Sequence, residues 1–380
     1  MKILIIARGV PHDNDPQEGC FEMDQAKALS ALGHEVVIMS VDSRVRKYWR
    51  KIGILKSVEG NITAYKLFLF PSSIIRHLLS AKVGYKIEAG LAKWLFKYVK
   101  NRHGDFDIVH AHFLPCIYYG AEIKKSFGCR LIATEHWSEL DKPDLTEIVK
   151  YLGAKSYPVV DRLISVSSSL SRQIKNKFGI SSIVIHNLIN GEFLDVNVAS
   201  VENKTGFIYV CVGSLIKRKG FDFLIKAFAD SESKDNGAKI LIVGGGPEKS
   251  NLKNQIDSLN LSDRILLLGQ KSKKEIFSIL HDADAFILPS RHENFSVSVL
   301  EAMACGNPVI ATICGGIREC IDSSNGVLVP VDDVKQMTNA IDTMCRNINN
   351  YSRSDISANC LAQYSSKAIA CKLVQVYKDV

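Results

Sequence analysis

Two glutamates eight positions apart, Glu293 and Glu301, stand at either end of an apolar run in the second half of the chain. Glu293 follows the strand-like run 285–290, so we expect it at the carboxyl end of that strand, where parallel sheets bind ligands. Glu301 lies in the helix predicted next. Ser298 and Glu301 also have the spacing of a capping box, so the alternative is that Glu301 only closes a helix terminus.

A basic loop occupies the equivalent place after another strand-like run, 207–213. Lys217, Arg218 and Lys219 precede Gly220, and the apolar residues that follow have helical spacing. Cations at the end of such a strand predict contacts with the oxygens of a diphosphate. A solvated surface loop is the alternative.

Glycine-rich turns follow two further stretches of the second half. The segment 243–248, VGGGPE, lacks the third glycine of a dinucleotide fingerprint and is equally consistent with a tight turn between strand and helix. The segment 314–319, CGGIRE, has a glycine pair before a predicted helical segment, whose free amides could receive a phosphate. A plain turn is again the alternative.

Short β-branched runs alternate with helical patterns, which predicts an α/β fold with parallel sheets covered by helices. Each half of the chain has six such runs, and the polar segment 190–206 separates the halves. We therefore expect two doubly wound domains, with the cleft between them as the first place to look for a ligand. The predicted strands are 2–7, 35–41, 107–113, 130–134, 162–167, 182–187, 207–213, 239–245, 264–269, 285–290, 308–312 and 326–330.

The pattern Glu293-x7-Glu301, followed by AMACGNPVIAT and GGI, resembles the retaining GT-B glycosyltransferases of family four. The resemblance continues through VGSLIKRKGFDFLIKAF, GGGPE, LLLGQ and ADAFILPS, and more weakly through ALSALGHEVVIM, DIVHAHF, ATEH, VSVSSSL and VIHNLIN. It covers nearly the whole chain and is strongest from Val212 to Asp332.

The resemblance implies a GT-B fold, in which two Rossmann-like domains face an interdomain cleft. Residues 1–190 would form the acceptor-side domain, 191–206 the linker and 207–362 the nucleotide-sugar-binding domain. A last helix, 363–380, would pack back on the first domain. A sugar would pass from its nucleoside diphosphate to an acceptor hydroxyl with retention of configuration. Because GT-B enzymes generally work without a metal, the resemblance implies that neither a metal nor another cofactor is needed.

Roles for single residues follow from the same resemblance. Glu301 would hold the ribose hydroxyls, Glu293 the transferred sugar and Lys219 the diphosphate, whose charge grows as the glycosidic bond breaks. His112, the second histidine of the HxH-like strand end, would approach the sugar or the acceptor. The expected donor-binding residues are Gly19, Arg218, Lys219, Gly244, Gly269, Glu293, Asn294, Phe295, Ser296, Val297, Glu301, Gly315 and Gly316.

The chain departs from the family pattern at three positions. Ser214 stands where the family often has an arginine, so one phosphate contact is missing unless Arg218 supplies it. Asn294 and Ser296 replace two glycines beside Glu293, which changes the loop that fits the donor sugar. Elsewhere, we interpret His110 as a buried core histidine, and Asp282-Ala-Asp284 as the end of a helix, not as a metal ligand set.

Positive charge is concentrated between Arg44 and His103. This segment contains 14 lysines and arginines but only two acidic residues, whereas the net charge of the whole chain is +8. Within this segment, 78–102 predicts an amphipathic helix with Leu91, Trp94, Leu95 and Tyr98 away from its lysines. The segment would bind anionic lipid head groups; an ordinary packed helix with a solvated basic side is the alternative. Nucleic acid is disfavoured, since no known module accompanies the charge. The residues expected at the acceptor or membrane are Arg44, Arg46, Lys47, Arg50, Lys51, Lys82, Lys86 and Lys93.

The ten cysteines are scattered without metal-site or disulfide spacing, so we expect reduced thiols in a cytoplasmic protein, peripheral at the inner membrane face if it touches lipid. The activity expected is transfer of a hexose-type sugar to a lipid-linked or oligosaccharide acceptor in cell-surface polysaccharide synthesis, such as capsule, lipopolysaccharide or exopolysaccharide. UDP-sugars are slightly favoured over GDP-sugars as donors. The alternatives are a GT-B nucleotide-sugar epimerase and a catalytically silent homologue that binds sugar nucleotides.

Overall fold

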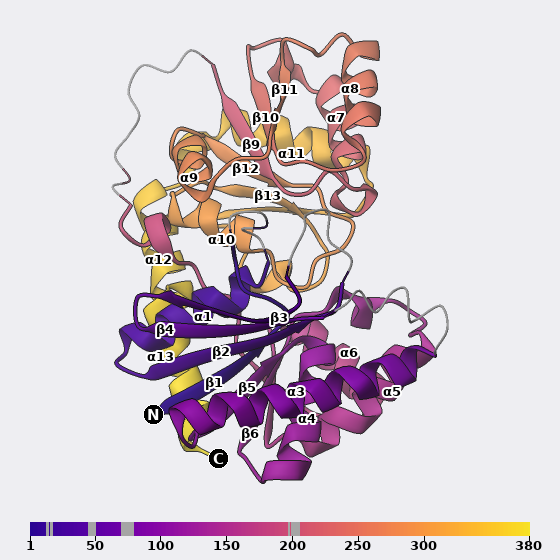
Figure 1. Ribbon diagram of the computed structural model, residues 1–380. Helices are drawn as coiled ribbons and strands as arrows, with labels where there is room; N and C mark the ends of the chain where they lie inside the picture. Colours follow the sequence, from indigo (N-terminus) through magenta and orange to yellow (C-terminus); the bar gives the residue numbers. More distant parts are fainter. Residues whose placement is uncertain (13–14, 16–17, 45–50, 70–79, 197, 199–205) are drawn as a thin grey trace. The chain divides into compact units, whose positions relative to one another are not determined.

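The computed structural model describes residues 1–12, 15, 18–44, 51–69, 80–196, 198 and 206–380. The chain divides into two compact units (Figure 1). The N-terminal unit comprises residues 1–186 and 369–380, and the C-terminal unit comprises 187–368. No helix in the described part of the chain is both long and apolar enough to cross a bilayer.

The unit boundaries differ from those expected at 190 and 363, because the end of the expected first domain and the start of the expected linker pack on the C-terminal unit. Asn187 donates a hydrogen bond to the carbonyl oxygen of Phe295 at 3.1 Å. The amide of Ile189 donates to the carbonyl oxygen of Tyr364 at 2.8 Å. Phe193 is buried with its ring 5.6 Å from that of Phe277. These contacts assign 187–194 to the C-terminal unit.

The N-terminal unit contains an eight-stranded sheet in the order β3-β4-β2-β1-β5-β6-β7-β8. Six of its strands match the six predicted runs and are parallel. Their buried residues are mostly β-branched or aliphatic, as both faces of a covered parallel sheet require. The strands are β1 (Lys2–Ala7), β2 (Glu35–Asp42), β3 (Gly53–Glu59), β4 (Ile62–Phe68), β5 (Ile108–His112), β6 (Leu131–Glu135), β7 (Arg162–Ser165) and β8 (Ile183–Val184).

The hairpin of β3 and β4 was not predicted, so the expectation of six strands in this half was wrong. β3 and β4 are antiparallel and joined by the two residues Gly60 and Asn61, with Gly60 at φ 57°. β4 then pairs in parallel with β2 and extends the sheet. β3 is the edge strand, and most of its side chains are exposed.

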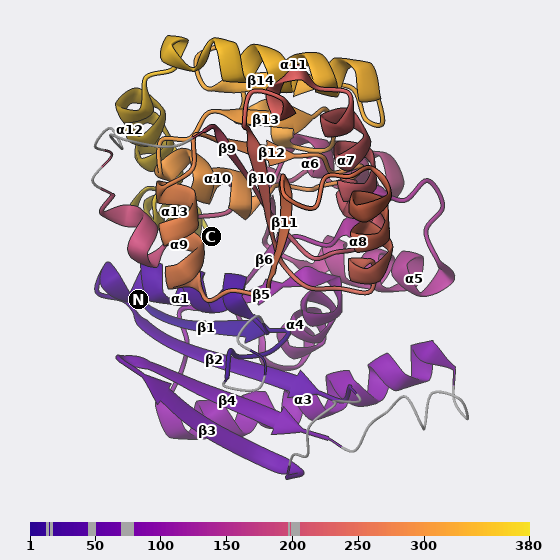
Figure 2. The ribbon, with the colours of Figure 1, turned by 90° about the horizontal axis from the view of Figure 1, so that it is seen from above.

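Helices cover both faces of the N-terminal sheet (Figures 1 and 2). On β5, His110 contacts Tyr377 of α13, whereas the next residue, Ala111, lies against Gly120 of α4. Successive side chains of a strand point to opposite faces, so α13 and α4 lie on opposite faces of the sheet. The helices are α1 (Cys20–Ala31), α3 (Ala81–His103), α4 (Phe113–Phe127), α5 (Glu147–Ser156), α6 (Ser168–Phe178) and α13 (Ser366–Lys378), whose last residues from Ile369 on belong to this unit.

The C-terminal unit contains a six-stranded sheet in the order β11-β10-β9-β12-β13-β14, parallel throughout. All six predicted runs form its strands, and the order is that of a dinucleotide-binding doubly wound sheet. β9 and β12 are neighbours at its centre, so the loops that follow them lie side by side. The strands are β9 (Ile208–Val212), β10 (Lys239–Val243), β11 (Ile265–Gly269), β12 (Ala285–Leu288), β13 (Val309–Thr312) and β14 (Gly326–Val329).

The core of the C-terminal unit is formed by the strands and the apolar faces of the helices, α7 and α11 in particular. Tyr209, Phe228 and Ile341 are completely buried in it, and the hydroxyl of Tyr209 donates to the carbonyl oxygen of Ile341 at 2.6 Å. The helices are α7 (Phe221–Ala229), α8 (Lys249–Ser258), α9 (Lys273–His281), α10 (Val297–Ala304), α11 (Val334–Arg346) and α12 (Arg353–Tyr364).

Candidate functional site

Lys219 and Glu293 form an ion pair at the carboxyl end of the C-terminal sheet. Lys219 ends a short 3-10 turn after β9, and Glu293 lies in the loop after β12. The hydroxyl of Ser290 donates to the same carboxylate oxygen of Glu293 at 2.8 Å. The two side chains are 15% and 9% exposed, so solvent screens their attraction only partly. The structure thus brings together the predicted diphosphate and sugar contacts.

Gly220 allows the two loops to approach this closely. It has φ 66°, and a Cβ at this position would overlap the carbonyl oxygen of Pro289. Glycine adopts this conformation without steric cost, whereas any other residue would be strained and would push the loops apart. Lys219 therefore owes its position opposite Glu293 to the glycine that follows it.

Arg291 joins the same two loops, although no sequence motif predicted a role for it. Its guanidinium donates to both carboxylate oxygens of Asp222 at 2.8 and 2.9 Å and to Asp332 at 2.8 Å. It also donates to the carbonyl oxygen of Lys217 at 2.6 Å. The hydrogen bonds to Asp222 and Asp332 raise the pKa of Arg291. The hydrogen bonds from Arg291 in turn lower the pKa of Asp222. Arg291 therefore fixes the turn that carries Lys219.

Arg218, predicted as a second phosphate ligand, lies in the same turn. Its Nη1 donates to the carbonyl oxygen of His292 at 3.4 Å, and its own carbonyl oxygen accepts from the amide of Arg291 at 2.8 Å. Arg218 therefore lies beside the loop of Glu293. Whether it replaces the contact missing at Ser214 stays a prediction.

The start of the helix after Glu293 shows that the capping-box alternative for Glu301 was wrong. α10 begins at Val297 with Ser296 as its N-cap, so Ser298 lies inside the helix and cannot cap it. The hydroxyl of Ser296 is 3.0 Å from that of Ser298 and accepts no capping hydrogen bond from a backbone amide of the helix. Glu301 is half-buried, one turn further along.

The predicted phosphate-binding amides around Gly316 are mostly engaged within the protein. The amide of Gly316 donates to the carbonyl oxygen of Asn294 at 3.0 Å, and that of Ile317 to the carbonyl oxygen of Cys314 at 3.3 Å. The expected helix after them is a single 3-10 turn, Ile317–Glu319, too short to contribute the positive end of a helix dipole. Gly315, with φ 53°, instead allows the loop to lie against the carbonyl oxygen of Glu293. The expectation of free amides at Gly316 and Ile317 was therefore wrong.

The remaining predicted donor residues are spread around this edge of the sheet. Gly244 has φ 145° and lies against the carbonyl oxygen of Gly213, and its amide donates to the carbonyl oxygen of Gly269 at 2.8 Å. The loops approach so closely that only glycine fits at position 244, which agrees with the tight-turn interpretation of this segment. The ring of Phe295 is buried 5.8 Å from that of Tyr364.

In the N-terminal unit, His110 and His112 end β5 and are completely buried. His110 is held by Tyr377 at 2.6 Å and Thr134 at 2.7 Å, as expected for a core histidine. His112 Nδ1 is 3.1 Å from His136 Nε2, and its Nε2 has no hydrogen-bond partner among the described residues. Burial lowers the pKa of both histidines well below the usual value, and His136 and Arg8 lower that of His112 further. These effects favour the neutral form of His112, whose unpartnered Nε2 can form a hydrogen bond with a ligand.

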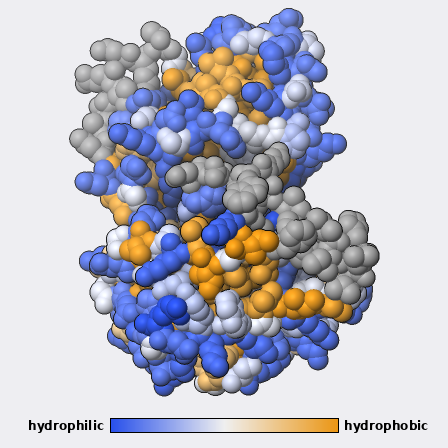
Figure 3. Space-filling view, in the orientation of Figure 1, coloured by the Kyte–Doolittle hydropathy of each residue, from blue (hydrophilic) through white to orange (hydrophobic). Residues whose placement is uncertain are grey.

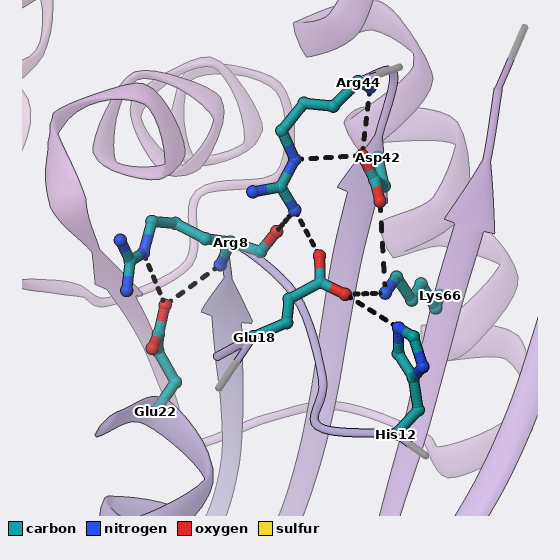
Figure 4. A network of polar contacts seen from close by, with 7 residues as sticks. All are labelled: Arg8, His12, Glu18, Glu22, Asp42, Arg44 and Lys66. Atoms are coloured by element: carbon teal, nitrogen blue, oxygen red, sulfur yellow. Dashed lines mark hydrogen bonds and ion pairs between the residues drawn. The ribbon is translucent and has the colours of Figure 1, made fainter. Parts of the chain in front are cut away.

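A charged network occupies the carboxyl ends of β1, β2 and β4 (Figure 4). The buried carboxylate of Glu18 is paired with Arg44 and Lys66 and lies 3.2 Å from His12. The Nε of Arg44 also donates to Asp42 at 3.0 Å. Gly19, a predicted donor residue, is the N-cap of α1 with φ 66°, and a Cβ there would overlap the carbonyl oxygen of Gly9.

Where the structure describes it, the predicted basic surface consists mostly of exposed side chains. The side chain of Arg44 is 48% exposed, but it is already ion-paired with Glu18 and Asp42. Trp94 was expected on the packed face of its helix, but it is 53% exposed, because Leu95, Phe96 and Val99 fill that face of α3. Lys51, Lys82 and Lys86 are exposed and Lys93 is half-buried; Arg46, Lys47 and Arg50 lie outside the described residues.

The metal-like motif Asp282-Ala-Asp284 has a structural role. Asp282 caps α9, and a carboxylate oxygen of Asp284 accepts from the amide of Ile208 at 2.8 Å at the start of β9. Within the described ranges, no three acidic, cysteine or histidine side chains are grouped as a metal site would require. All ten cysteines are free thiols.

Comparison with family models assigns both halves of the chain. Residues 23–193 match the model described as Glycosyltransferase Family 4, and residues 195–359 match Glycosyl transferases group 1. An uncharacterized glycosyltransferase of Methanocaldococcus jannaschii is 31% identical over 288 residues, which are 72% of this chain and 76% of the relative.

The substrate of a second relative and the ligands of a similar solved structure are known by name. A GDP-mannose-dependent monoacylated alpha-(1-6)-phosphatidylinositol monomannoside mannosyltransferase of Corynebacterium glutamicum is 27% identical, covering 62% of this chain and 68% of the relative. The crystal structure of Anabaena HepE in complex with UDP and glucose superposes with a TM-score of 0.75 at 18% identity over the full length of both chains. At this identity, the structural match establishes the shared fold alone.

Proposed function

Because the chain belongs to the family 4 glycosyltransferases of the GT-B fold, we propose that it is a retaining hexosyltransferase that uses a nucleoside diphosphate sugar. The observation that carries the proposal is the pairing of Lys219 with Glu293 at the carboxyl ends of β9 and β12. This edge of a doubly wound sheet is where nucleotides bind.

In the proposed reaction, the acceptor oxygen bonds to the anomeric carbon as the bond from that carbon to the diphosphate breaks. Lys219 stabilises the negative charge that grows on the diphosphate, and Glu293 stabilises the positive charge on the sugar. Glu301 accepts hydrogen bonds from the ribose hydroxyls. The proton of the acceptor hydroxyl leaves with the nucleoside diphosphate.

We propose UDP-sugars as donors and a reaction that needs no metal. The complex of HepE with UDP and glucose supports the donor, and the GDP-mannose dependence of the Corynebacterium relative makes a GDP-sugar the competing choice. The test is to incubate the protein with UDP-glucose, UDP-galactose and GDP-mannose, with and without EDTA, and to measure the nucleoside diphosphate released. Release that EDTA abolishes contradicts metal independence, and no release from any donor contradicts the proposal.

The proposed acceptor is lipid-linked or an oligosaccharide, for cell-surface polysaccharide synthesis at the cytoplasmic face of the membrane. Val83, Ile87 and Trp94 are 38, 50 and 53% exposed and lie along one stripe of α3, with the exposed Lys82 and Lys86 beside it. Figure 3 shows apolar residues gathered on this face of the N-terminal unit. Such a helix suits an anionic bilayer surface, where each lysine contributes about 1 kcal/mol.

Vesicle sedimentation tests the membrane contact. The protein should sediment with phosphatidylglycerol vesicles more than with phosphatidylcholine vesicles, and salt should weaken the binding. Ile87→Glu and Trp94→Glu should abolish sedimentation, whereas Ile183→Glu, at an exposed apolar site on β8, should not. Equal sedimentation of all variants contradicts this part of the proposal.

Two other functions fit the same fold. An epimerase would convert the donor sugar without any acceptor, which thin-layer analysis of the recovered nucleotide sugar would reveal. A silent homologue would bind nucleotide sugars, as measured by calorimetry, yet never release the nucleoside diphosphate. The Lys219–Glu293 pair favours transfer over both.

A further inference from the structure

A cavity of about 340 Å³ opens in the N-terminal unit at the carboxyl ends of β2, β1, β5 and β6. Its wall includes Arg8 and Arg44 from the loops after β1 and β2, and Glu88 from α3. Phe113 at the start of α4 and Trp137 after β6 also line it. The volume is within the range of small-ligand sites, and the position is where such sheets bind ligands.

Arg8 presents an unused pair of hydrogen-bond donors in this wall. Its backbone amide and its Nε donate to Glu22 at 3.1 and 3.3 Å, and no described residue accepts a hydrogen bond from its Nη1 or Nη2 (Figure 4). The carboxylate of Glu22 is completely buried, whereas the side chain of Arg8 is 36% exposed. The open edge of the guanidinium is thus the part that a ligand can reach.

Phe113 fixes the plane of this guanidinium. The Arg8 carbon Cζ lies 3.3 Å from the centre of the Phe113 ring, and the ring of His136 stacks on Phe113 at 4.7 Å. Phe113 has φ 65°, a conformation that costs a non-glycine residue free energy and persists where the surroundings impose it. An arginine stacked in this way offers two parallel N–H bonds, which match a carboxylate or a phosphate.

The opposite part of the wall suits hydroxyl groups. Glu88 is buried and its two carboxylate oxygens accept from Ser43 and Tyr119, each at 2.5 Å. Burial and the charge of Glu88 raise the pKa of Tyr119, so its phenol stays a donor. Tyr85 and Trp137 add aromatic surface of the kind on which sugar rings pack.

We propose that this cavity binds the acceptor of the transfer reaction, and that the acceptor sugar carries an anionic group held by the Nη edge of Arg8. The inference rests on the proposed transferase function, since only a transferase needs an acceptor. The carboxylates of Glu18, Glu22 and Asp42 balance the cations of the network, so recognition depends on directed donors and not on net charge.

Calorimetry with three probes tests the inference: methyl glucuronide, glucose 6-phosphate and the neutral methyl glucoside. At least one acidic sugar should bind the wild-type protein roughly tenfold or more tightly than methyl glucoside, and which of the two does so distinguishes a carboxylate from a phosphate. Arg8→Gln should remove the preference, and Arg8→Lys should keep a smaller one, because lysine retains the charge without the fork. Arg172→Gln, at an exposed arginine of α6, is the matched control and should keep the full preference.

Equal affinity for charged and neutral sugars overturns the inference, as does an Arg8→Gln protein that keeps the preference or a wild-type protein that binds none of the probes at millimolar concentration. Thermal unfolding shows whether Arg8→Gln is still folded. If it is not, the anion preference of Arg8→Lys is compared with that of the wild type instead, and an unchanged preference overturns the inference. Binding of a UDP-sugar by the same preparations tests the proposed function separately. A protein that binds UDP-sugars and lacks anion preference contradicts the acceptor inference alone.

Discussion

The two units both place opposite charges at the carboxyl ends of parallel strands, but they do so on different scales. In the C-terminal unit the arrangement is one lysine and one glutamate, with Ser290 as a further donor. In the N-terminal unit, three cations and three buried carboxylates form a continuous network. The side chains of the small pair are 15% and 9% exposed, whereas the carboxylates of the network are at most 2% exposed. We therefore expect single substitutions to affect turnover in one unit and stability in the other.

The largest effect expected is on stability, from Lys66→Met in the network. The side chains of Lys66 and Glu18 are 5% and 2% exposed. Removing the lysine therefore leaves the buried negative charge of Glu18 with one ion-pair partner fewer. Loss of one partner of a buried pair costs about 3 kcal/mol, which urea unfolding would measure. Lys56→Met, at an exposed position of the adjacent strand β3, is the control. Equal unfolding midpoints for the two variants would contradict the structural role of the network.

In the C-terminal unit, Lys219→Ala and Glu293→Gln should each lower kcat roughly a hundredfold or more, since both groups act where charge develops. Because this pair is more exposed than that of Lys66 and Glu18, both proteins should lose less stability than Lys66→Met does. Lys226→Ala, at an exposed lysine on α7, should keep full activity. A steady-state assay of nucleoside diphosphate release checks all three, and wild-type turnover by Lys219→Ala would remove its assignment.

Gly220→Ala tests whether the spacing of the two loops matters as much as their charges. Its Cβ would overlap the carbonyl oxygen of Pro289, so we expect a loss of about 2 kcal/mol beyond that of Gly191→Ala. Gly191 has nearly the same φ, 69°, with no described atom near its added Cβ, and therefore isolates the clash from the backbone strain. Thermal unfolding of the two variants gives the difference, and equal losses would argue against the close contact.

The smallest effect expected is a pH dependence from Glu135 in the N-terminal unit. Burial raises its pKa from 4.5 to about 7, although Tyr157 donates to it at 2.8 Å. Between these values the folded state holds a proton that the unfolded state has lost. The contribution to stability is therefore complete below pH 4.5 and is lost as the pH rises to 7.

Glu135→Gln lacks this titration, so the difference in Tm between wild type and variant should change by about 2–4 °C between pH 5 and pH 7.5, to the disadvantage of the wild type. Thr134→Ser, a substitution on the same strand that changes no charge, should follow the wild-type pH dependence. A constant difference between wild type and Glu135→Gln would show that Glu135 is already ionised at pH 5.

The contrast between the units also explains what could be predicted from the sequence. The six strands of the C-terminal unit are short apolar runs separated by glycine-rich turns, and all six predictions are confirmed. The hairpin of β3 and β4 was missed because Lys56, Ser57 and Lys66 interrupt its apolar residues within a strongly basic segment. The two-residue turn Gly60–Asn61 was the signal that could have found it.

The same omission hid the charged network and the cavity beside it. Lys66 reaches Glu18 only because β4 pairs with β2, and β2 with β1, in the register Ala7, Ser40, Lys66. Without β4 in the predicted sheet, nothing places these residues near one another. Lys219 and Glu293, by contrast, follow strands that were predicted, and a family motif marks them. The family expectation is confirmed, whereas the assigned donor residues stay predictions.

The ribosome makes the pieces of the N-terminal unit at different times, because α13 follows the whole C-terminal unit along the chain. Until α13 emerges, the face of β5 that carries His110 lacks Tyr377, its later partner. Domains fold as units during synthesis. Residues 187–368 can therefore mature first, although residues 1–186 precede them, and the amino-terminal sheet receives the cover of α13 only after the C-terminal unit has been made.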